Sequence, residues 1–184
     1  MDKKKRFRWN AVIDRVKDIE GPIIGAELGV WKGKMSYFLL SELPNLNLHM
    51  VDRWAPPEEG DSYHTSGSQM ALCNTKDFDR VYAEAMAKVF PFKDRAIVYE
   101  MTTVGAALNV DNGMFDFVFI DADHSYEGVR NDIAAWKDKV KPGGWLCGHD
   151  WKNIKKGNVE KAVREFFKPE QIEVDANSTW FVRM

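Results

Sequence analysis

Residues 115–124 read FDFVFIDADH, and this stretch decides the class of fold that the sequence predicts. Its first six residues are almost all apolar, which is typical of a strand buried on both faces of a sheet. Three ionisable residues, Asp121, Asp123 and His124, follow where the apolar run ends. Burying such groups for packing alone is costly, so the end of this strand is a candidate for chemistry.

Short apolar runs of this kind recur along the whole chain and alternate with amphipathic segments. Strands are predicted at residues 23–28, 48–51, 96–100, 145–147, 171–174 and 179–182, and helices at 9–19, 34–41, 77–90, 126–140 and 159–167. This alternation is typical of an α/β fold with a mainly parallel sheet. We expect one domain over residues 1–184, a Rossmann-like, doubly wound sheet of seven strands with helices on both faces and a reversed edge strand.

Composition excludes several classes of protein. The chain has 184 residues, 45% of them hydrophobic, and a net charge of −2, which favours an ordinary globular protein and gives no basic field for nucleic acid. Two cysteines, Cys73 and Cys147, are too few for a disulfide framework. The sequence has neither a signal-peptide pattern nor an apolar run long enough to span a membrane, so we expect a cytoplasmic protein. The basic run at residues 3–8 is interpreted as solvated charge.

Residues 54–75 differ from the rest, since they are rich in proline, glycine and serine and show little periodicity. Long irregular loops in compact domains are either disordered or functional. We interpret this segment, with Tyr63 and His64, as a lid over an acceptor pocket.

Acidic residues stand at the ends of four predicted strands: Glu27, Asp52, Asp121 and Asp150. Ligands of doubly wound sheets bind beyond the carboxyl ends of the strands, so these side chains are expected to converge. Glycines after the first strand, in residues 27–33 (ELGVWKG), allow the backbone to approach a ligand closely. An acid placed as Asp52 is can accept both hydroxyl groups of a ribose, although a turn aspartate is the alternative.

Asp121 and His124 are spaced to serve as metal ligand and general base. Asp150 could complete an oxygen-rich site with Asp121, and such a site suits magnesium better than zinc. Two local alternatives remain open at this stage. Asp123 could cap the following helix, and His149 could be a core histidine bonded to the backbone.

Taken together, these motifs resemble a known family. The chain resembles the class I S-adenosylmethionine-dependent methyltransferases in the order of four motifs. These are ELGVWKG, an acid after the second strand, FIDADHSY and PGG…GHD. Within that class it most resembles a small branch that carries Asp-x-Asp-His-x-Tyr after the fourth strand and is related to catechol-type and macrolide-sugar O-methyltransferases. The resemblance spans residues 25–150.

The resemblance implies which residues contact the cofactor. The glycine-containing segment would line its methionine half, the acid after the second strand would hold the ribose, and the residues after the third strand would contact the adenine. Those positions and their neighbours are Glu27, Gly29, Trp31, Gly33, Asp52, Arg53, Trp54, Met101, Thr102, Thr103 and Asp121.

The resemblance also implies the chemistry. Methyl transfer to a hydroxyl group of a small molecule or sugar is expected, with His124 as the base beside Asp121. In metal-dependent relatives, Asp121 and Asp150 match magnesium ligands. Two departures stand out: Trp151 replaces a usual oxygen ligand, and Met101 replaces a common glycine.

Other functions compete with this interpretation. A nicotinamide oxidoreductase shares the sheet but needs G-x-G-x-x-G, which is missing here. Asp121-Ala-Asp123 is formally the D-x-D of a nucleotide-sugar glycosyltransferase. A cofactor-binding module without catalysis is the third alternative. Methylation of adenine amino groups in nucleic acid generally accompanies an Asn/Asp-Pro-Pro-Tyr run, where this chain has Asp121-Ala-Asp-His. Neither the acceptor nor the oligomeric state is predicted.

Overall fold

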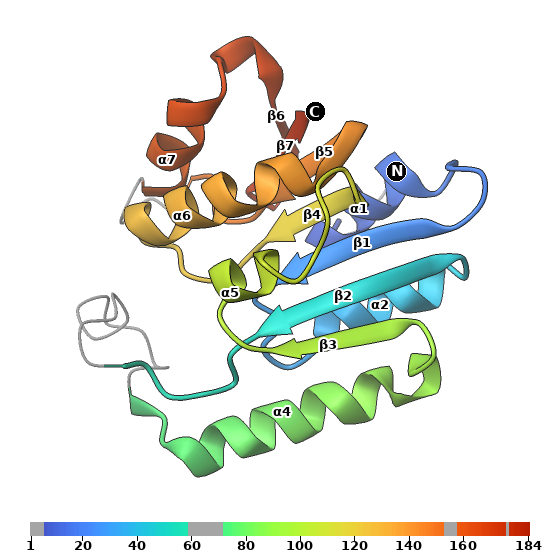
Figure 1. Ribbon diagram of the computed structural model, residues 1–184, viewed down its shortest axis with the longest axis vertical. Coiled ribbons are helices and arrows are strands. Elements are labelled where there is room, and N and C mark those ends of the chain that lie inside the picture. Colours follow the sequence, from blue (N-terminus) through green and yellow to red (C-terminus); the bar gives the residue numbers. More distant parts are fainter. Residues whose placement is uncertain (1–5, 59–71, 153–157, 176) are drawn as a thin grey trace.

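The computed structural model describes residues 6–58, 72–152, 158–175 and 177–184. Its described strands form a seven-stranded sheet in the order β3-β2-β1-β4-β5-β7-β6 (Figure 1). Their bounds are β1 (Ile23–Leu28), β2 (Leu46–Asp52), β3 (Ala96–Glu100), β4 (Phe115–Ile120), β5 (Val140–Gly148), β6 (Ile172–Asp175) and β7 (Thr179–Arg183). The first five strands are parallel, and β7 is antiparallel to both β5 and β6. The predicted sheet is confirmed, with the reversed strand lying between β5 and the edge strand β6.

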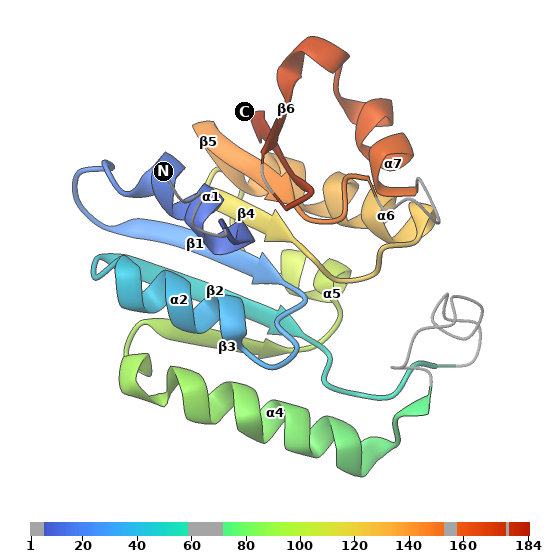
Figure 2. The ribbon, with the colours of Figure 1, turned by 180° about the vertical axis from the view of Figure 1, so that it is seen from behind.

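Helices cover both faces of this sheet. One face carries α1 (Arg8–Val16), α2 (Lys34–Glu42) and α4 (Thr75–Val89), and the other carries α5 (Thr103–Ala107), α6 (Tyr126–Trp136) and α7 (Asn158–Phe166) (Figures 1 and 2). Among the described residues, no helix has both the length and the apolar composition that crossing a bilayer requires.

The apolar character of β4 follows from this layering. Side chains alternate between the two faces of a strand, and those of Phe117 and Phe119 belong to the core cluster on the α1–α2–α4 side. Val118 and Ile120 belong to the cluster on the α5–α6–α7 side. A strand that packs helices on both faces needs a continuous apolar run, which is why residues 115–120 predict it well.

Two local predictions were wrong. The short helix α5 was not predicted, because five residues are too few to show helical periodicity. Residues 142–144 were expected to be a turn before the fifth strand, but they lie inside β5. There Phe115 pairs with Val140 and Phe117 with Trp145, so the extra residues of β5 bulge out, with Gly143 at φ +81°.

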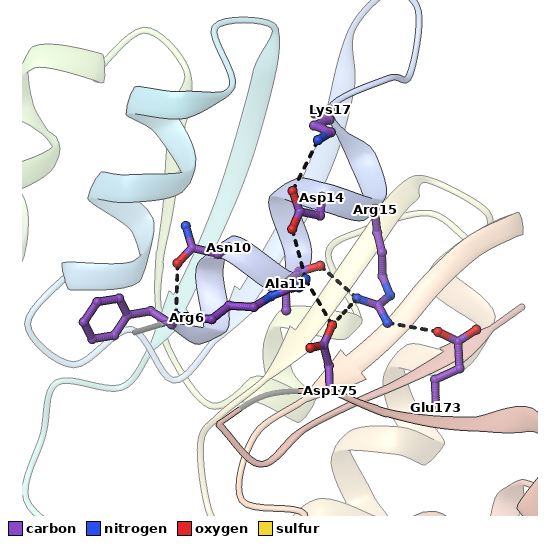
Figure 3. A network of polar contacts seen from close by, with 9 residues as sticks. Arg6, Asn10, Ala11, Asp14, Arg15, Lys17, Glu173 and Asp175 are labelled. Atoms are coloured by element: carbon purple, nitrogen blue, oxygen red, sulfur yellow. Dashed lines mark hydrogen bonds and ion pairs between the residues drawn. The ribbon is translucent and has the colours of Figure 1, made fainter. Parts of the chain in front are cut away.

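The helix α1 is tied to the far end of the chain (Figure 3). Arg15 donates hydrogen bonds to Asp175 and Glu173 of β6, both at 2.9 Å, and its guanidinium carbon lies 3.6 Å from the centre of the Phe181 ring in β7. At its amino end, the ring of Trp9 stacks on α2, 4.5 Å from that of Phe38. These contacts hold α1 against the sheet at both of its ends.

Candidate functional site

The residues that follow the parallel strands meet at one edge of the sheet. Gly29, Met101, Asp121 and His149 each donate their backbone N–H to one of the last two residues of a neighbouring strand, at distances of 2.8 to 3.1 Å. The chain therefore continues to pair one residue beyond the strands. This pairing brings the segments after β1, β3, β4 and β5 together, as parallel topology predicts.

A cavity of about 440 Å³ opens along this edge. Eight residues expected at the cofactor site lie in its wall: Gly29, Trp31, Asp52, Arg53, Met101, Thr102, Thr103 and Asp121. The remaining lining residues come from the start of the predicted lid, from α4 and α5, and from the β4–α6 segment: Ala55, Pro57, Phe78, Val104, Ala122, Asp123, Gly128, Asn131 and Asp132. Most of the predicted lid, residues 59–71 including Tyr63 and His64, lies outside the described residues.

Gly29 forms the floor of the cavity, where β1 meets β4. Its φ is +88°, and a Cβ atom placed on it would lie 2.3 Å from the carbonyl oxygen of Asp121. A side chain at this position would collide with backbone, so only glycine allows the two strand ends to approach this closely.

Asp52 is held in place by backbone donors. Its Oδ2 accepts the N–H of Trp31 at 2.8 Å and its Oδ1 accepts the N–H of Trp54 at 2.9 Å. Burial raises the pKa of Asp52, and the backbone hydrogen bonds oppose that shift. The donors include the backbone of Val30 and Arg53 as well, so the segments after β1 and β2 both fix this carboxylate at the cavity wall.

The two tryptophans beside Asp52 have unusual backbone conformations. Trp31 has φ +52° and Trp54 has φ +43°, and this region is strained for bulky residues. The indole N–H of Trp54 donates to the carbonyl oxygen of Trp31 at 2.8 Å, which links the segments after β1 and β2. Trp54 itself is buried behind the cavity wall.

Two other expected cofactor residues support the wall and do not line it. Glu27 is 2% exposed and accepts a hydrogen bond from the hydroxyl group of Ser36 at 2.5 Å. Burial raises the pKa of Glu27 to about 8. Gly33, with φ +68°, is the N-cap residue of α2. A Cβ atom placed on it would lie 3.0 Å from the Cα atom of Ala85 in α4.

A cluster of charged side chains lies next to Asp121. His124 Nε2 is 3.1 Å from Asp121 Oδ1 and 3.5 Å from Asp150 Oδ2. His149 Nδ1 is 3.6 Å from Asp121 Oδ1 and 3.2 Å from Asp150 Oδ1. The structure thus brings together the predicted acids and the predicted base, and it adds His149 to them.

These contacts shift the pKa values in opposite directions. Burial lowers the pKa of His124, but the hydrogen bond to Asp121 and the charges of Asp121 and Asp150 outweigh it, so the pKa is raised. The hydrogen bond with His149 holds the pKa of Asp150 below its ordinary value, although burial opposes it. The arrangement therefore favours a protonated His124 and an ionised Asp150.

Arg8 occupies the remaining side of this cluster. Its Nη1 lies 2.6 Å from Asp121 Oδ2 and 3.4 Å from His149 Nδ1. The sequence interpretation of residues 3–8 as solvated charge was wrong for Arg8, because the docking of α1 is a tertiary contact. No local signal in the basic run distinguishes this arginine from its neighbours.

The same contacts test whether magnesium fits. A cation between Asp121 and Asp150 would meet the guanidinium of Arg8 and two imidazole rings that already contact these carboxylates. The buried ring of Trp151 follows Asp150, where a further oxygen ligand would be needed. Within the described ranges, no three His, Cys, Asp or Glu side chains form a group able to hold a metal ion. The residues present do not fit magnesium.

Sequence reasoning also missed Asp132 in the cavity wall. This acid lies on the buried side of α6 together with Val129, Ile133 and Trp136. A carboxylate on an apolar helix face was the signal that could have identified it. The local alternative for Asp123 was wrong, because the N-cap residue of α6 is Ser125, whose side chain accepts the N–H of Gly128. Asp123 supports this cap, since its carboxylate accepts the N–H and the hydroxyl group of Ser125.

Comparisons with known proteins agree with this fold. A family model described as a methyltransferase domain matches residues 26–151, and no curated protein sequence matches. Similar solved structures include the following: the calicheamicin methyltransferase CalS11 (TM-score 0.63, 15% identity, 95% of this chain and 76% of that one), the O-methyltransferase NovP (0.67, 14%, 96% and 78%) and the N-methyltransferase NodS from Bradyrhizobium japonicum (0.57, 15%, 96% and 92%).

At these identities the solved structures show the fold, and the family match covers more than half of the chain. The sequence resemblance rests on the glycine segment after β1, on Asp52 at the end of β2 and on the acidic residues after β4 and β5, and the structure brings these to one edge of the sheet. The chain belongs to the class I S-adenosylmethionine-dependent methyltransferases.

Proposed function

We propose that this protein transfers the methyl group of S-adenosylmethionine to a hydroxyl group of a small molecule or sugar, with His124 as the general base. The observation that carries the proposal is the pair formed by His124 and Asp121, 3.1 Å apart, with Asp121 in the cavity wall. An imidazole bonded to a carboxylate at the rim of a ligand cavity is a suitable proton acceptor.

The cavity wall supports binding of this cofactor. Asp52 would accept the ribose hydroxyl groups, Gly29 would allow the methionine part to approach the backbone, and residues 101–103 with Arg53 would contact the adenine. Glu27, Gly33 and Trp54 would support that wall from behind, since they are packed beneath it. When bound, S-adenosylmethionine supplies a methyl group that moves to the acceptor oxygen as the C–S bond breaks, leaving S-adenosylhomocysteine.

His124 would take the proton that the acceptor hydroxyl loses. With Nε2–H directed at Asp121, Nδ1 is the nitrogen that accepts the proton, and the carboxylates of Asp121 and Asp150 stabilise the resulting imidazolium. Alignment of the acceptor and removal of its proton are the tasks left to the protein, because the methyl group is already activated.

We propose that this reaction uses no divalent cation. Arg8 stands 2.6 Å from Asp121, so its fixed positive charge would act on an acceptor oxygen bound beside Asp121. Such preorganised charge stabilises a transition state without reorganisation.

The first test is calorimetric titration of the purified protein with S-adenosylhomocysteine, with NAD as a matched control, each in the presence of Mg²⁺ or of EDTA. We expect binding of S-adenosylhomocysteine only, unchanged by Mg²⁺. Binding of NAD, or of neither compound by a folded sample, would reject the proposed cofactor. Affinity that depends on Mg²⁺ would reject the metal-free site.

The second test screens phenolic, sugar and amine acceptors with radiolabelled S-adenosylmethionine. Methyl transfer to a hydroxyl compound that is lost in His124→Gln supports the proposal. Transfer to amines alone would reject O-methylation, and no transfer together with firm cofactor binding would favour a non-catalytic cofactor-binding module.

A further inference from the structure

Asp132 is a buried acid for which the methyl-transfer mechanism has no use. Its residue is 3% exposed, and its neighbours on the inner face of α6 are Val129, Ile133 and Trp136. Burying a carboxylate among apolar side chains is costly unless hydrogen-bond donors surround it. The position of Asp132 in the cavity wall offers a reason to keep it.

The hydrogen bonding of Asp132 is incomplete. Thr103 donates its hydroxyl hydrogen to Asp132 Oδ1 at 2.5 Å, and this is the only hydrogen bond of the carboxyl group found among the described residues. A carboxylate can accept about four hydrogen bonds. Buried polar groups are nearly always satisfied in native proteins, so a group with spare acceptors in a cavity wall is suited to a ligand that donates.

The position of Asp132 indicates which part of the cavity it serves. Thr103 begins α5 directly after β3, and β3 pairs with β2, so that Glu100 lies opposite Asp52. Trp136 donates its indole N–H to the carbonyl oxygen of Thr103 at 3.0 Å, which fixes α6 against this segment. Asp132 therefore faces the part of the cavity bounded by residues 101–103.

The charges around Asp132 also favour a donor. The pKa of Asp132 is raised to about 7, chiefly by burial. The charge of Asp123 adds to this shift, whereas the hydrogen bond from Thr103 and the charge of His124 oppose it. No arginine or lysine is among the groups that act on it in the described part of the chain. A ligand N–H that donates to Asp132 would offset the free-energy cost of burying its carboxylate, whereas a ligand acceptor at that place would add to the cost.

We propose that Asp132, positioned by Thr103, selects an amino-substituted purine in this cavity by accepting a hydrogen bond from the exocyclic N–H. This inference rests on the proposed function, which places the base of S-adenosylmethionine in this part of the cavity. A purine with an oxo group at the same position would present an acceptor to the carboxylate and is rejected. Asp132 is thus a specificity residue and has no part in the methyl-transfer step.

The test compares S-adenosylhomocysteine with S-inosylhomocysteine, in which an oxo group replaces the amino group. Calorimetry on the full-length protein measures the affinity ratio for the two compounds at a pH above the raised pKa of Asp132, where its carboxylate is ionised and can only accept. We expect the wild type to prefer the amino compound by about 30-fold or more, because a mismatched polar contact leaves buried groups unpaired. In Asp132→Asn, the ratio should fall below about 5-fold, because an amide can donate to the oxo group as well as accept.

Two further variants separate recognition from structure. Glu127→Gln removes an exposed carboxylate from the same helix, outside the cavity wall, and it should leave the affinity ratio within about 2-fold of that of the wild type. Thr103→Val retains the shape of the residue but frees Asp132, and it should reduce the ratio partially. Circular dichroism and thermal melts confirm that each variant is folded.

The outcomes distinguish this inference from the function on which it rests. If S-adenosylhomocysteine does not bind to the folded wild type, the proposed function fails and takes the inference with it. If it binds but the wild type does not discriminate between the compounds, or Asp132→Asn discriminates equally well, the inference alone is overturned. If Asp132→Asn does not fold, the wild-type ratio and Thr103→Val decide the question.

Discussion

At the scale of single residues, the proposed chemistry of the site depends on whether the imidazole of His124 is protonated. Its Nε2 faces two carboxylates, at 3.1 and 3.5 Å, and these raise its pKa even though burial, the largest effect, lowers it. A general base must be unprotonated before it can act. The carboxylates that orient the imidazole therefore also shift its working range to higher pH.

We predict that kcat/KM rises with pH and reaches half of its maximum above the ordinary histidine pKa of 6.5. Below that midpoint, His124 is protonated and cannot accept the substrate proton. His124→Gln should lower methyl transfer by about 10²–10⁴-fold and change the affinity for S-adenosylhomocysteine little. Initial rates between about pH 5 and pH 9 measure the pH dependence and the loss of methyl transfer, and calorimetry measures the affinity for S-adenosylhomocysteine. An unchanged acidic limb in the variant would show that another group is the base.

Gly29 provides a second test at this scale, since its Cβ position overlaps the backbone of Asp121 at 2.3 Å. Gly29→Ala should weaken binding of S-adenosylhomocysteine by at least ~10-fold, because β1 and β4 must separate beneath the ligand, and should lower stability by about 2–4 kcal/mol. Gly21→Ala is the matched control, as Gly21 has a similar φ of +84° with nothing within 4 Å of its Cβ position. Equal losses in the two variants would mean that backbone strain alone matters.

At the scale of an element, α1 carries Arg8 to the site. This helix lies outside the range that the family model matches. It is anchored by Arg15 to β6 (Figure 3) and by Trp9 to α2. Arg6 forms ion pairs with Asp14 and with Asp175 on the exposed side. The same helix thus presents one arginine to Asp121 in the cavity wall and another to solvent.

We predict that Arg8→Met lowers methyl transfer by about 10²-fold, in the range reported for losing one transition-state donor. Arg6→Met should stay within about 2-fold of the wild type, because exposed ion pairs contribute little. Steady-state rates with the acceptor from the screen, measured with and without EDTA, check the comparison. Equal effects of the two substitutions would assign both arginines to the docking of α1.

At the scale of the whole molecule, the buried acids of the site reduce the stability of the unliganded protein at high pH. Burial raises the pKa of Glu27 to about 8 and that of Asp132 to about 7. Between its ordinary pKa and the raised value, each group binds more protons in the folded than in the unfolded state. The free energy of unfolding therefore falls as pH rises through this window.

We predict that thermal stability of the ligand-free protein decreases between about pH 5 and pH 9. Over this range, the free energy of unfolding of Glu27→Gln should rise relative to that of the wild type by roughly 2–4 kcal/mol, since one pKa unit corresponds to about 1.4 kcal/mol. Glu84→Gln is the control, because Glu84 is exposed and Lys88 and Lys32 lower its pKa. Thermal melts at several pH values give the slopes, and equal slopes for all three proteins would contradict this role of Glu27.

Much of the frame follows from the sequence alone. The bounds of β1, β3 and β4 coincide with those predicted. For β1 and β4 the reason is that buried parallel strands need continuous apolar runs, and here these runs end at glycine or acidic residues. In a parallel sheet, the residues after the strands meet at one edge, so Gly29, Asp52 and Asp121 could be identified as neighbours without coordinates.

The tertiary structure decided the rest, since it depends on contacts between distant segments. Arg8 reaches Asp121 across 113 positions of the chain, and Thr103 reaches Asp132 from another helix. Hydrophobic periodicity describes which face of an element is buried, but it does not say which element will cover that face. For that reason the sequence determined which residues meet at the end of the sheet, whereas the fold determined that Arg8 pairs with Asp121.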